Sequence, residues 1–377
     1  MNNNKTNSST DHTTGSGALL EVRDLCIEFP TRRGILKAID GISLSLRAGE
    51  ILGVVGESGA GKSLTGTAIT GLLERPGRIA GGEIRFNGQR IDNLPAEAMR
   101  KLRGKQIGSI FQDPLTSLNP LYSVGRQLIE TIRTHTDLTP RQARARAIEM
   151  LTQVGIPAPE QRIDQYPHQF SGGMRQRVVI ALALCVNPKL VIADEPTTAL
   201  DVSVQAQIID LLKTLCREHG SAVMLVTHDM GVIAETCDRV AVMYAGRLVE
   251  VGPVQEVVKH ARHPYTRGLM GSIPKLGEEV EHLVQIDGAM PRLSHIPQGC
   301  AFNPRCPYAT ARCREEKPEF ALAGRGEVAC WLWDGVNPAT DPDTLFAEAS
   351  LARRADKQMN AARSAPKKSL QTCGQEV

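Results

Sequence analysis

The sequence predicts an α/β fold: a sheet covered by helices, with an antiparallel β subdomain, an inserted helical subdomain and a small irregular cysteine-rich C-terminal extension. Three observations predict this class. Short β-branched runs alternate with helix-compatible stretches along the 377-residue chain, the pattern of a sheet with covered faces. The stretch 121–163 is helical in pattern, with Ala- and Arg-rich segments such as 141–154. After Pro253 the composition turns rich in Pro and Cys, which marks a second, smaller unit.

The expected elements are set by short local signals. Asn87-Gly88 follows the run 84–86, and Asn-Gly is the preferred pair of a two-residue hairpin turn, so part of the N-terminal region is expected to be antiparallel. The helical subdomain is expected over about 115–175. The runs expected to be strands are Glu50–Val55, Glu83–Phe86, Leu190–Ala193, Ala222–Thr227 and Val240–Met243.

The composition divides the chain into two folded parts between two tails. Residues 19–255 are expected to form the main domain and residues 256–340 the extension. Residues 1–18 are rich in Ser, Thr and Asn, and residues 341–377 are basic with few large apolar side chains. Such compositions cannot bury enough apolar surface to become ordered, so both tails are expected to be disordered.

Composition and charge also exclude several classes. Hydrophobic residues make up 41% and charged residues 23% of the chain, as in ordinary soluble globular proteins. The longest apolar run, 178–186, has nine residues, whereas about 20 are needed to cross a bilayer, and the first eighteen residues lack a secretory signal. The net charge of +3 is concentrated in 352–377, which leaves the body near neutral and argues against nucleic acid as a partner. We expect a protein that does not span a membrane and stays in the cytosol.

A phosphate-binding loop is the strongest local motif. Residues 56–63, GESGAGKS, fit G-x-x-x-x-G-K-[ST] between an apolar run and a helix-compatible stretch, which argues against a glycine-rich turn without a ligand. The glycines let backbone N–H groups turn toward an anion, and the next helix presents its positive end to the same phosphates. Lys62 is expected on the β- and γ-phosphates and Ser63 on Mg²⁺. The residues expected to hold ATP here are Gly56, Glu57, Ser58, Gly59, Ala60, Gly61, Lys62 and Ser63.

Two adjacent carboxylates end the apolar run 190–193. On their own, Asp194 and Glu195 would be a solvated loop, but together with a phosphate-binding loop they are expected to approach the nucleotide. Asp194 is expected to hold Mg²⁺, directly or through water. Glu195 is then the candidate general base that polarises the attacking water.

Several further motifs surround these carboxylates in the chain. They are Gln112 in IFQDP, Ser171-Gly172-Gly173 in FSGGMRQR, Ala199-Leu200-Asp201, and His228 in VTHD. In this order after Lys62 they resemble the nucleotide-binding subunit of ATP-binding cassette (ABC) transporters, although the first signature position is usually Leu and the fifth often Gln in that family. The resemblance implies an ATP-hydrolysing P-loop NTPase cassette with a mixed RecA-like sheet.

The resemblance also implies that the active unit is a dimer. Two cassettes would dimerise head to tail, so that Ser171, Gly172 and Gly173 touch the γ-phosphate held by the partner's loop. Asp201, in the D-loop, belongs to the same nucleotide-binding set. A single cassette would then be nearly inactive.

Three more residues receive roles by resemblance. His228 would contact the γ-phosphate and orient the water, and it is therefore counted with Glu195 as catalytic. Gln112 would touch Mg²⁺ and report the state of the nucleotide to a membrane partner. Phe29 either stacks on adenine or simply packs in the sheet; the sequence leaves both open.

The segments RHPYT at 262–266 and GCAFNPRCPY at 299–308 narrow the resemblance. Over roughly 19–335 the chain resembles the bacterial peptide and nickel importer family, closest to the D-type ATPase subunit of dipeptide permeases. This implies a subunit that powers uptake of dipeptides, oligopeptides, nickel chelates or glutathione. It would be a peripheral protein on the cytoplasmic face of the inner membrane. The implied partners are a second, distinct ABC ATPase subunit, two integral membrane permease subunits, and a periplasmic or lipid-anchored solute-binding protein. A soluble ABC ATPase acting on ribosomes or DNA is the alternative, and a redox-sensing subunit is a third.

Four cysteines cluster in the extension. Cys300, Cys306, Cys313 and Cys330 have the spacing C-x5-C-x6-C-x16-C. A reducing cytosol disfavours two disulfides, and four thiolates can complete a zinc or an iron-sulfur site, although the paired C-x2-C spacing usual for zinc is absent. Because some members of the resembled family carry a [4Fe-4S] cluster in this extension, iron-sulfur is favoured over zinc or free thiols. Its expected role is to stabilise a small unit with few aromatic residues.

Overall fold

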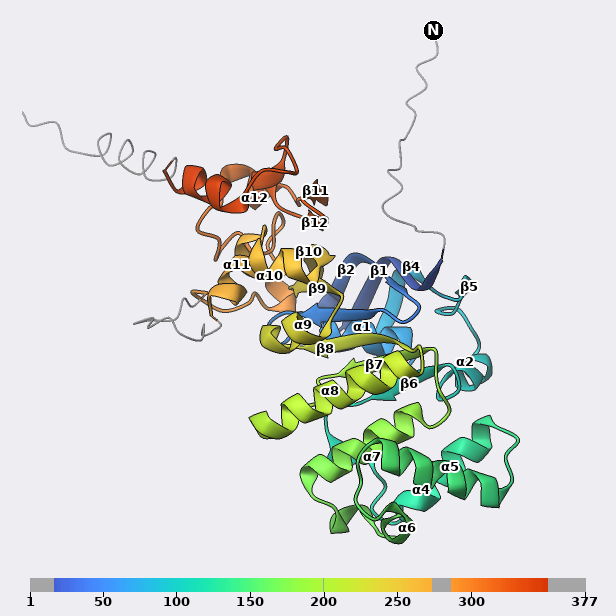
Figure 1. Ribbon diagram of the computed structural model, residues 1–377. Coiled ribbons are helices and arrows are strands. Elements are labelled where there is room, and N and C mark those ends of the chain that lie inside the picture. Colours follow the sequence, from blue (N-terminus) through green and yellow to red (C-terminus); the bar gives the residue numbers. More distant parts are fainter. Residues whose placement is uncertain (1–16, 199, 273–285, 352–377) are drawn as a thin grey trace, which may run out of the picture.

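The computed structural model describes residues 17–198, 200–272 and 286–351, which form an α/β fold around two sheets (Figure 1). The larger sheet has the strand order β11-β12-β10-β9-β3-β8-β7-β6. Its strands are β3 Ile51–Val55, β6 Ile107–Ile110, β7 Leu190–Asp194, β8 Ala222–Thr227, β9 Arg239–Tyr244, β10 Arg247–Pro253, β11 Ala321–Ala323 and β12 Gly326–Val328. Strands β6, β7, β8, β3 and β9 are parallel, and β10, β12 and β11 add to them antiparallel. The predicted mixed sheet is therefore confirmed.

The smaller sheet is antiparallel and N-terminal, with the order β2-β1-β4-β5. Its strands are β1 Ala18–Thr31, β2 Gly34–Arg47, β4 Arg78–Phe86 and β5 Gln89–Arg90. Asn87 and Gly88 join β4 to β5 with φ of 50° and 77°, the positive pair that a type I′ turn requires. The predicted antiparallel subdomain and its turn are both present.

Helices cover the large sheet, and a helical group lies to one side of it, in green at the bottom of Figure 1. Helix α5 shows why a helix starts there: Thr139 and Gln142 form a reciprocal capping box, and Pro140 occupies the first turn. The helices are α1 Lys62–Ile69, α2 Ala96–Leu102, α3 Pro114–Ser117, α4 Val124–His135, α5 Pro140–Gln153, α6 Pro159–Arg162, α7 Gly172–Leu184, α8 Val202–Glu218, α9 Met230–Thr236, α10 Val254–Lys259, α11 Pro264–Gly271 and α12 Ala311–Glu315, with 3-10 turns at Pro167–Gln169, Leu293–His295 and Trp331–Trp333. The expected inserted helical subdomain is thus observed.

The parallel strands form the core that positions the site. Every residue of β3 and of β8 is buried, because helices cover one face of these strands and the antiparallel sheet with α1 covers the other. Strand β3 leads into the phosphate-binding loop, β7 ends at Asp194, and β8 leads to His228. Since the carboxyl ends of parallel strands lie at one edge of a sheet, these groups gather there.

The extension is continuous with this core. Strands β11 and β12 widen the large sheet, with Glu250 of β10 opposite Val328 of β12. Phe302 belongs to the same buried cluster as Tyr244 of β9. Trp333 is buried, and its Nε1 donates a 3.0 Å hydrogen bond to the carbonyl of Arg262.

One expectation about the C-terminal tail is wrong. Residues 342–351 are helical, although 341–377 is expected above to be disordered. Phe346 is buried, with its ring centroid 5.1 Å from that of Tyr308, and the guanidinium of Arg267 lies 4.7 Å from the same ring. Leu345 packs against the buried cluster around Trp333, so two neighbouring apolar side chains anchor this segment. The rest of both tails, 1–16 and 352–377, lies outside the described residues.

Candidate active site

The phosphate-binding loop links β3 to α1 and depends on two glycines. A Cβ at Gly56 would collide with the carbonyl of Met243, so only glycine lets the loop pass this strand. Gly61 has φ of 105° and directly precedes α1, a backbone conformation that L side chains rarely adopt. Helix α1 begins at Lys62 and points its N-terminus at the loop, where backbone N–H groups favour an anion.

Lys62 lies inside this loop. Its side chain is buried, and its Nζ donates to the carbonyls of Gly56 at 2.8 Å and Glu57 at 3.2 Å. Burial lowers the pKa of Lys62, while the carboxylates of Glu195 and Asp194 act in the opposite direction. The ammonium is therefore held within the anion-binding loop and beside the acidic end of β7.

Ser63 and Asp194 form a pair of oxygen ligands next to it. Ser63 Oγ donates a 2.9 Å hydrogen bond to Asp194 Oδ1. Burial raises the pKa of Asp194, the bond from Ser63 opposes this, and Glu195 adds to it. A hydroxyl and a carboxylate in contact are the hard oxygen donors that Mg²⁺ prefers, so the residues present fit this ion.

Three side chains surround Glu195: one from its own turn and two that follow neighbouring strands. Its Oε2 accepts hydrogen bonds from Gln112 Nε2 at 3.1 Å and from Thr198 Oγ1 at 2.9 Å, and His228 Nδ1 lies 3.4 Å from Oε1. Glu195 itself has φ of 44°, an uncommon value outside glycine that turns the chain at the end of β7. The arrangement places a carboxylate in contact with an imidazole, close to the lysine of the loop that binds phosphates.

The signature residues lie elsewhere in the chain's own fold. Ser171 caps helix α7, with its Oγ accepting from Met174 N at 3.3 Å, and Asp201 caps α8 through Val204 N at 3.0 Å. A Cβ added to Gly172 would meet Leu200, and one on Gly173 would meet Val204. Among the described residues no hydrogen bond joins this group to the phosphate-binding loop. The signature thus presents a capped helix start beside the Asp201 segment, of which Ala199 lies outside the described residues.

Phe29 lies on β1, where the alternatives were adenine stacking and packing. It is half-buried and packs against the core of the antiparallel sheet. A Cβ at Gly77 would come within 2.8 Å of its ring. The structure thus shows that Phe29 packs in the sheet. Its contact with adenine stays a prediction.

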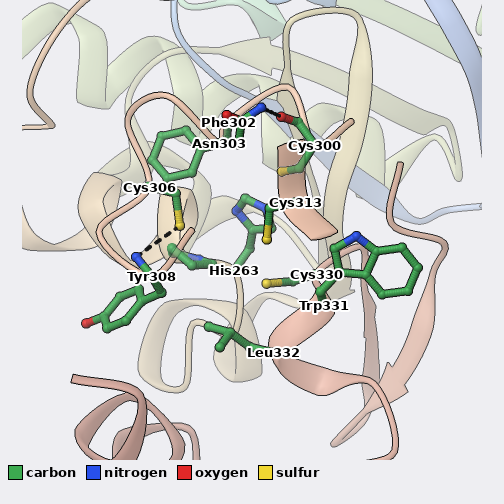
Figure 2. A pocket seen from close by; sticks show the side chains of 11 residues that line it. His263, Cys300, Phe302, Asn303, Cys306, Tyr308, Cys313, Cys330, Trp331 and Leu332 are labelled. Carbon is green, nitrogen blue, oxygen red and sulfur yellow. Dashed lines mark hydrogen bonds between the residues drawn. The ribbon is translucent and has the colours of Figure 1, made fainter. Parts of the chain in front are cut away.

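The four cysteines of the extension converge. Cys300, Cys306, Cys313 and Cys330 line one cavity, which His263 and Phe302 also border (Figure 2). Burial raises the pKa of Cys330, and the three other thiols add to that effect. Within the described ranges, no three His, Cys, Asp or Glu side chains are arranged to hold a metal ion. The predicted convergence of the thiols is therefore observed, and neither iron-sulfur nor zinc is confirmed.

Comparison with known proteins finds two matching families and several similar proteins. Residues 39–198 match the family "ABC transporter", and residues 249–313 match the family "Oligopeptide/dipeptide transporter, C-terminal region". The oligopeptide transport ATP-binding protein OppD of Haemophilus influenzae is 48% identical over 315 residues, which cover 83% of this chain and 97% of that protein. The dipeptide transport ATP-binding protein DppD of Escherichia coli is 47% identical over 309 residues, 82% of this chain and 94% of that protein.

The chain belongs to the ABC transporter family. A dimeric ATP-binding cassette in a post-hydrolysis state, bound to ADP and phosphate, superimposes on this ABC ATPase with a TM-score of 0.56 and 28% identity, over 62% of this chain and 98% of that one. The cassette fold and ATP hydrolysis predicted from the motifs are thereby confirmed. None of the helices in the described ranges has both the length and the apolar character needed to cross a membrane.

The sequence motifs of this ABC ATPase do not predict three of the contacts around the ATP site. Tyr265 and Arg305 both bind Glu57, and Thr198 binds Glu195. Tyr265 and Arg305 lie in the two segments that narrowed the resemblance, 262–266 and 299–308, but a sequence gives no sign that these segments reach residue 57. Thr198 follows Glu195 by three positions, and this spacing within a turn was the available signal.

Proposed function

We propose that this ABC ATPase supplies the energy for importing dipeptides, oligopeptides or related solutes across the cytoplasmic membrane. The observation that carries the proposal is the joint match of cassette and extension, since relatives named for oligopeptide and dipeptide transport align over more than four fifths of the chain. Nickel chelates and glutathione belong to the same proposed solute range. A soluble ABC ATPase acting on ribosomes or DNA is not favoured by these relatives.

The residues of the proposed ATP site have separate roles in binding and hydrolysis. The backbone of the loop and Lys62 bind the phosphates, and Ser63 with Asp194 would hold Mg²⁺, which neutralises charge on the phosphates when bound. Glu195 accepts the proton of the attacking water, and His228 orients that water. Gln112, bonded to Glu195 at the entrance to the helical subdomain, links this carboxylate to the part of the cassette that faces a membrane partner.

The assembly we propose has two cassettes. Ser171, Gly172 and Gly173 lie at the start of α7 and make no hydrogen bond to this chain's own loop in the described ranges, as expected for groups that serve a partner's ATP. The partner we propose is a second, distinct ABC ATPase subunit. Two integral membrane permease subunits and a periplasmic or lipid-anchored solute-binding protein complete the transporter, with this chain peripheral on the cytoplasmic face of the inner membrane.

We further propose that the cysteine cavity holds one [4Fe-4S] cluster. Four thiols line one cavity of the extension, as the ligands of a single metal group would, and cysteine thiolates are the usual ligands of iron-sulfur clusters. Bound there, the cluster would cross-link three separate parts of the extension and add folding energy. The ligands would be Cys300, Cys306, Cys313 and Cys330.

Isolation of the intact assembly tests the transport proposal. The tagged chain is purified from detergent-solubilised membranes, and the co-purifying proteins are identified. Two integral membrane proteins and a second cassette in equal amounts are the expected result. Recovery of the chain with ribosomes or DNA, and without any membrane protein, would favour the soluble alternative.

A further inference from the structure

We infer that Arg305 of the extension is a positioning residue for the ATP site, acting through Glu57 of the phosphate-binding loop. The inference rests on the proposed role of this loop in holding ATP. It gives the extension a part in nucleotide binding.

The contacts are direct and specific. Arg305 Nη1 donates to both oxygens of the Glu57 carboxylate, at 2.8 Å and 3.1 Å, across 248 positions of the chain. Glu57 N donates a 2.8 Å hydrogen bond to the hydroxyl of Tyr265 in α11. The second residue of the loop is therefore held at its amide and at its carboxylate by two residues that follow the cassette.

Arg305 is itself held in place. Its side chain is only 7% exposed. Its Nε donates to the carbonyl of Asp287 at 2.8 Å, its Nη2 donates to the carbonyl of Ile286 at 3.2 Å, and its Nη1 lies 3.3 Å from the Tyr244 hydroxyl. The guanidinium therefore has partners for each of its nitrogen atoms. A group fixed in this way can fix what it binds.

The link to ATP runs through position and charge. The carbonyl of Glu57 accepts a hydrogen bond from Lys62 Nζ, so a shift of Glu57 moves a contact of the phosphate-binding lysine. The Glu57 carboxylate also lies within electrostatic reach of Lys62. Without Arg305 this partly buried carboxylate would lose the cation that is hydrogen-bonded to it, and Lys62, which is needed for the phosphates, would be the charge left to balance it. Breaking a buried ion pair by removing one partner leaves an uncompensated charge, which here would repel ATP.

Substitution of Arg305 and substitution of Glu57 should weaken MgATP binding to different extents. Arg305→Met leaves a charged, loosened Glu57 in the loop and should weaken MgATP binding strongly. Glu57→Gln removes the charge together with its anchor and should weaken binding less. In the double variant the arginine has nothing left to neutralise, so its loss should add little to that of Glu57→Gln.

The test is MgATP affinity of the full-length chain, measured by titration calorimetry. We expect at least a tenfold higher Kd for Arg305→Met, about threefold for Glu57→Gln, and about threefold for the double variant. Lys317→Met is the matched control, because Lys317 also joins the extension to the cassette, 3.1 Å from Asp40, and in the described ranges it makes no hydrogen bond to the loop. Its Kd should stay within twofold of the wild type. In the assembled transporter, Arg305→Met should raise KM for ATP while kcat changes less than threefold.

Three results would overturn the inference: unchanged affinity in folded Arg305→Met, equal losses in Arg305→Met and Lys317→Met, or additive losses in the double variant. If Arg305→Met does not fold, Arg305→Lys replaces it, and a Kd within twofold of the wild type in that variant counts against the role. Lys62→Ala separates this inference from the proposed function. Unchanged MgATP binding in Lys62→Ala would contradict the ATP site itself, whatever the behaviour of Arg305.

Discussion

Gln112 Nε2 donates a 3.1 Å hydrogen bond to Glu195 Oε2, and the two residues are 83 positions apart. The bond joins the end of β6 to the end of β7, which are paired neighbours in the large sheet. It places the proposed catalytic carboxylate in contact with the segment that enters the helical subdomain. The state of the ATP site and the position of that subdomain can therefore be coupled through one side chain.

Glu195→Gln is expected to keep ATP binding and lose most turnover. The amide retains the shape of the side chain but cannot accept a proton from water, so kcat should fall at least about a hundredfold, within the range of general-base contributions. Steady-state hydrolysis by the assembled transporter and nucleotide affinity are measured together. Glu218→Gln, which removes an exposed carboxylate at the end of α8, is the control. Turnover near the wild-type rate in Glu195→Gln would contradict the assignment.

Local patterns explain why so much of the ATP site was predictable. The loop 56–63, the pair Asp194-Glu195 and the turn Asn87-Gly88 each lie within a few residues, and the buried strands β7 and β8 are continuous apolar runs. The long strands β1 and β2 were harder to find. Their pairing contains several register shifts, which interrupt the alternation that marks a strand.

Contacts between segments that are distant in the sequence could not be predicted, for a different reason. Glu57 and Arg305 meet where Phe302 and Tyr265 of the extension pack on Tyr244 of β9, and no local pattern encodes that packing. The helix at 342–351 was not predicted because the expectation of disorder rested on the average composition of the whole segment 341–377. Phe346 is buried and Leu345 packs against the cluster around Trp333, which is enough to anchor the helix.

Ser171→Arg should abolish hydrolysis at the partner's ATP site, because the signature is proposed to act across the dimer. The test uses mixed complexes in which only the partner's own phosphate-binding loop is functional. Ser171 also caps α7, so the substitution costs about 1 kcal/mol of helix stability as well. Ser123→Arg controls for this, since Ser123 caps α4 of the same subdomain with an equal 3.3 Å bond. Unchanged hydrolysis in Ser171→Arg would rule out the across-dimer role.

The cysteine cavity gives a metal prediction. Protein purified without oxygen should be brown, with about four irons per chain. Cys330→Ser should lower the iron content and the protease resistance of 256–340, because the cluster is proposed to stabilise this unit. Cys26→Ser, which alters a cysteine on β1 outside the cavity, should change neither. Stoichiometric zinc would refute iron-sulfur but keep a metal cross-link, and absence of any metal would remove both.

Glu250 predicts a pH dependence of stability. It is fully buried on β10, where its two oxygens accept 2.9 Å hydrogen bonds from the backbone N–H groups of Arg262 and His263. Burial raises its pKa from 4.5 to about 7. A raised acid pKa means that the folded state holds the proton more tightly, so this contribution is complete below pH 4.5 and is lost as pH rises to about 7.

The size of that loss is about 3 kcal/mol, at about 1.4 kcal/mol for each pKa unit. Glu250→Gln should start from a lower stability, since one amide oxygen replaces two acceptors, but should lack the decline across this pH range. Urea unfolding at several pH values measures the slope. Equal slopes in the wild type and the variant would contradict the buried, protonated state.

ATP-driven uptake by the complete transporter tests the central claim most directly. The assembly is reconstituted in proteoliposomes with MgATP on the side of the cassettes, and labelled dipeptides and longer peptides are supplied with the solute-binding protein on the other side. We predict accumulation of peptide that requires ATP and is lost in Glu195→Gln. Uptake that is equal with and without ATP, or equal in the wild type and Glu195→Gln, would contradict the account.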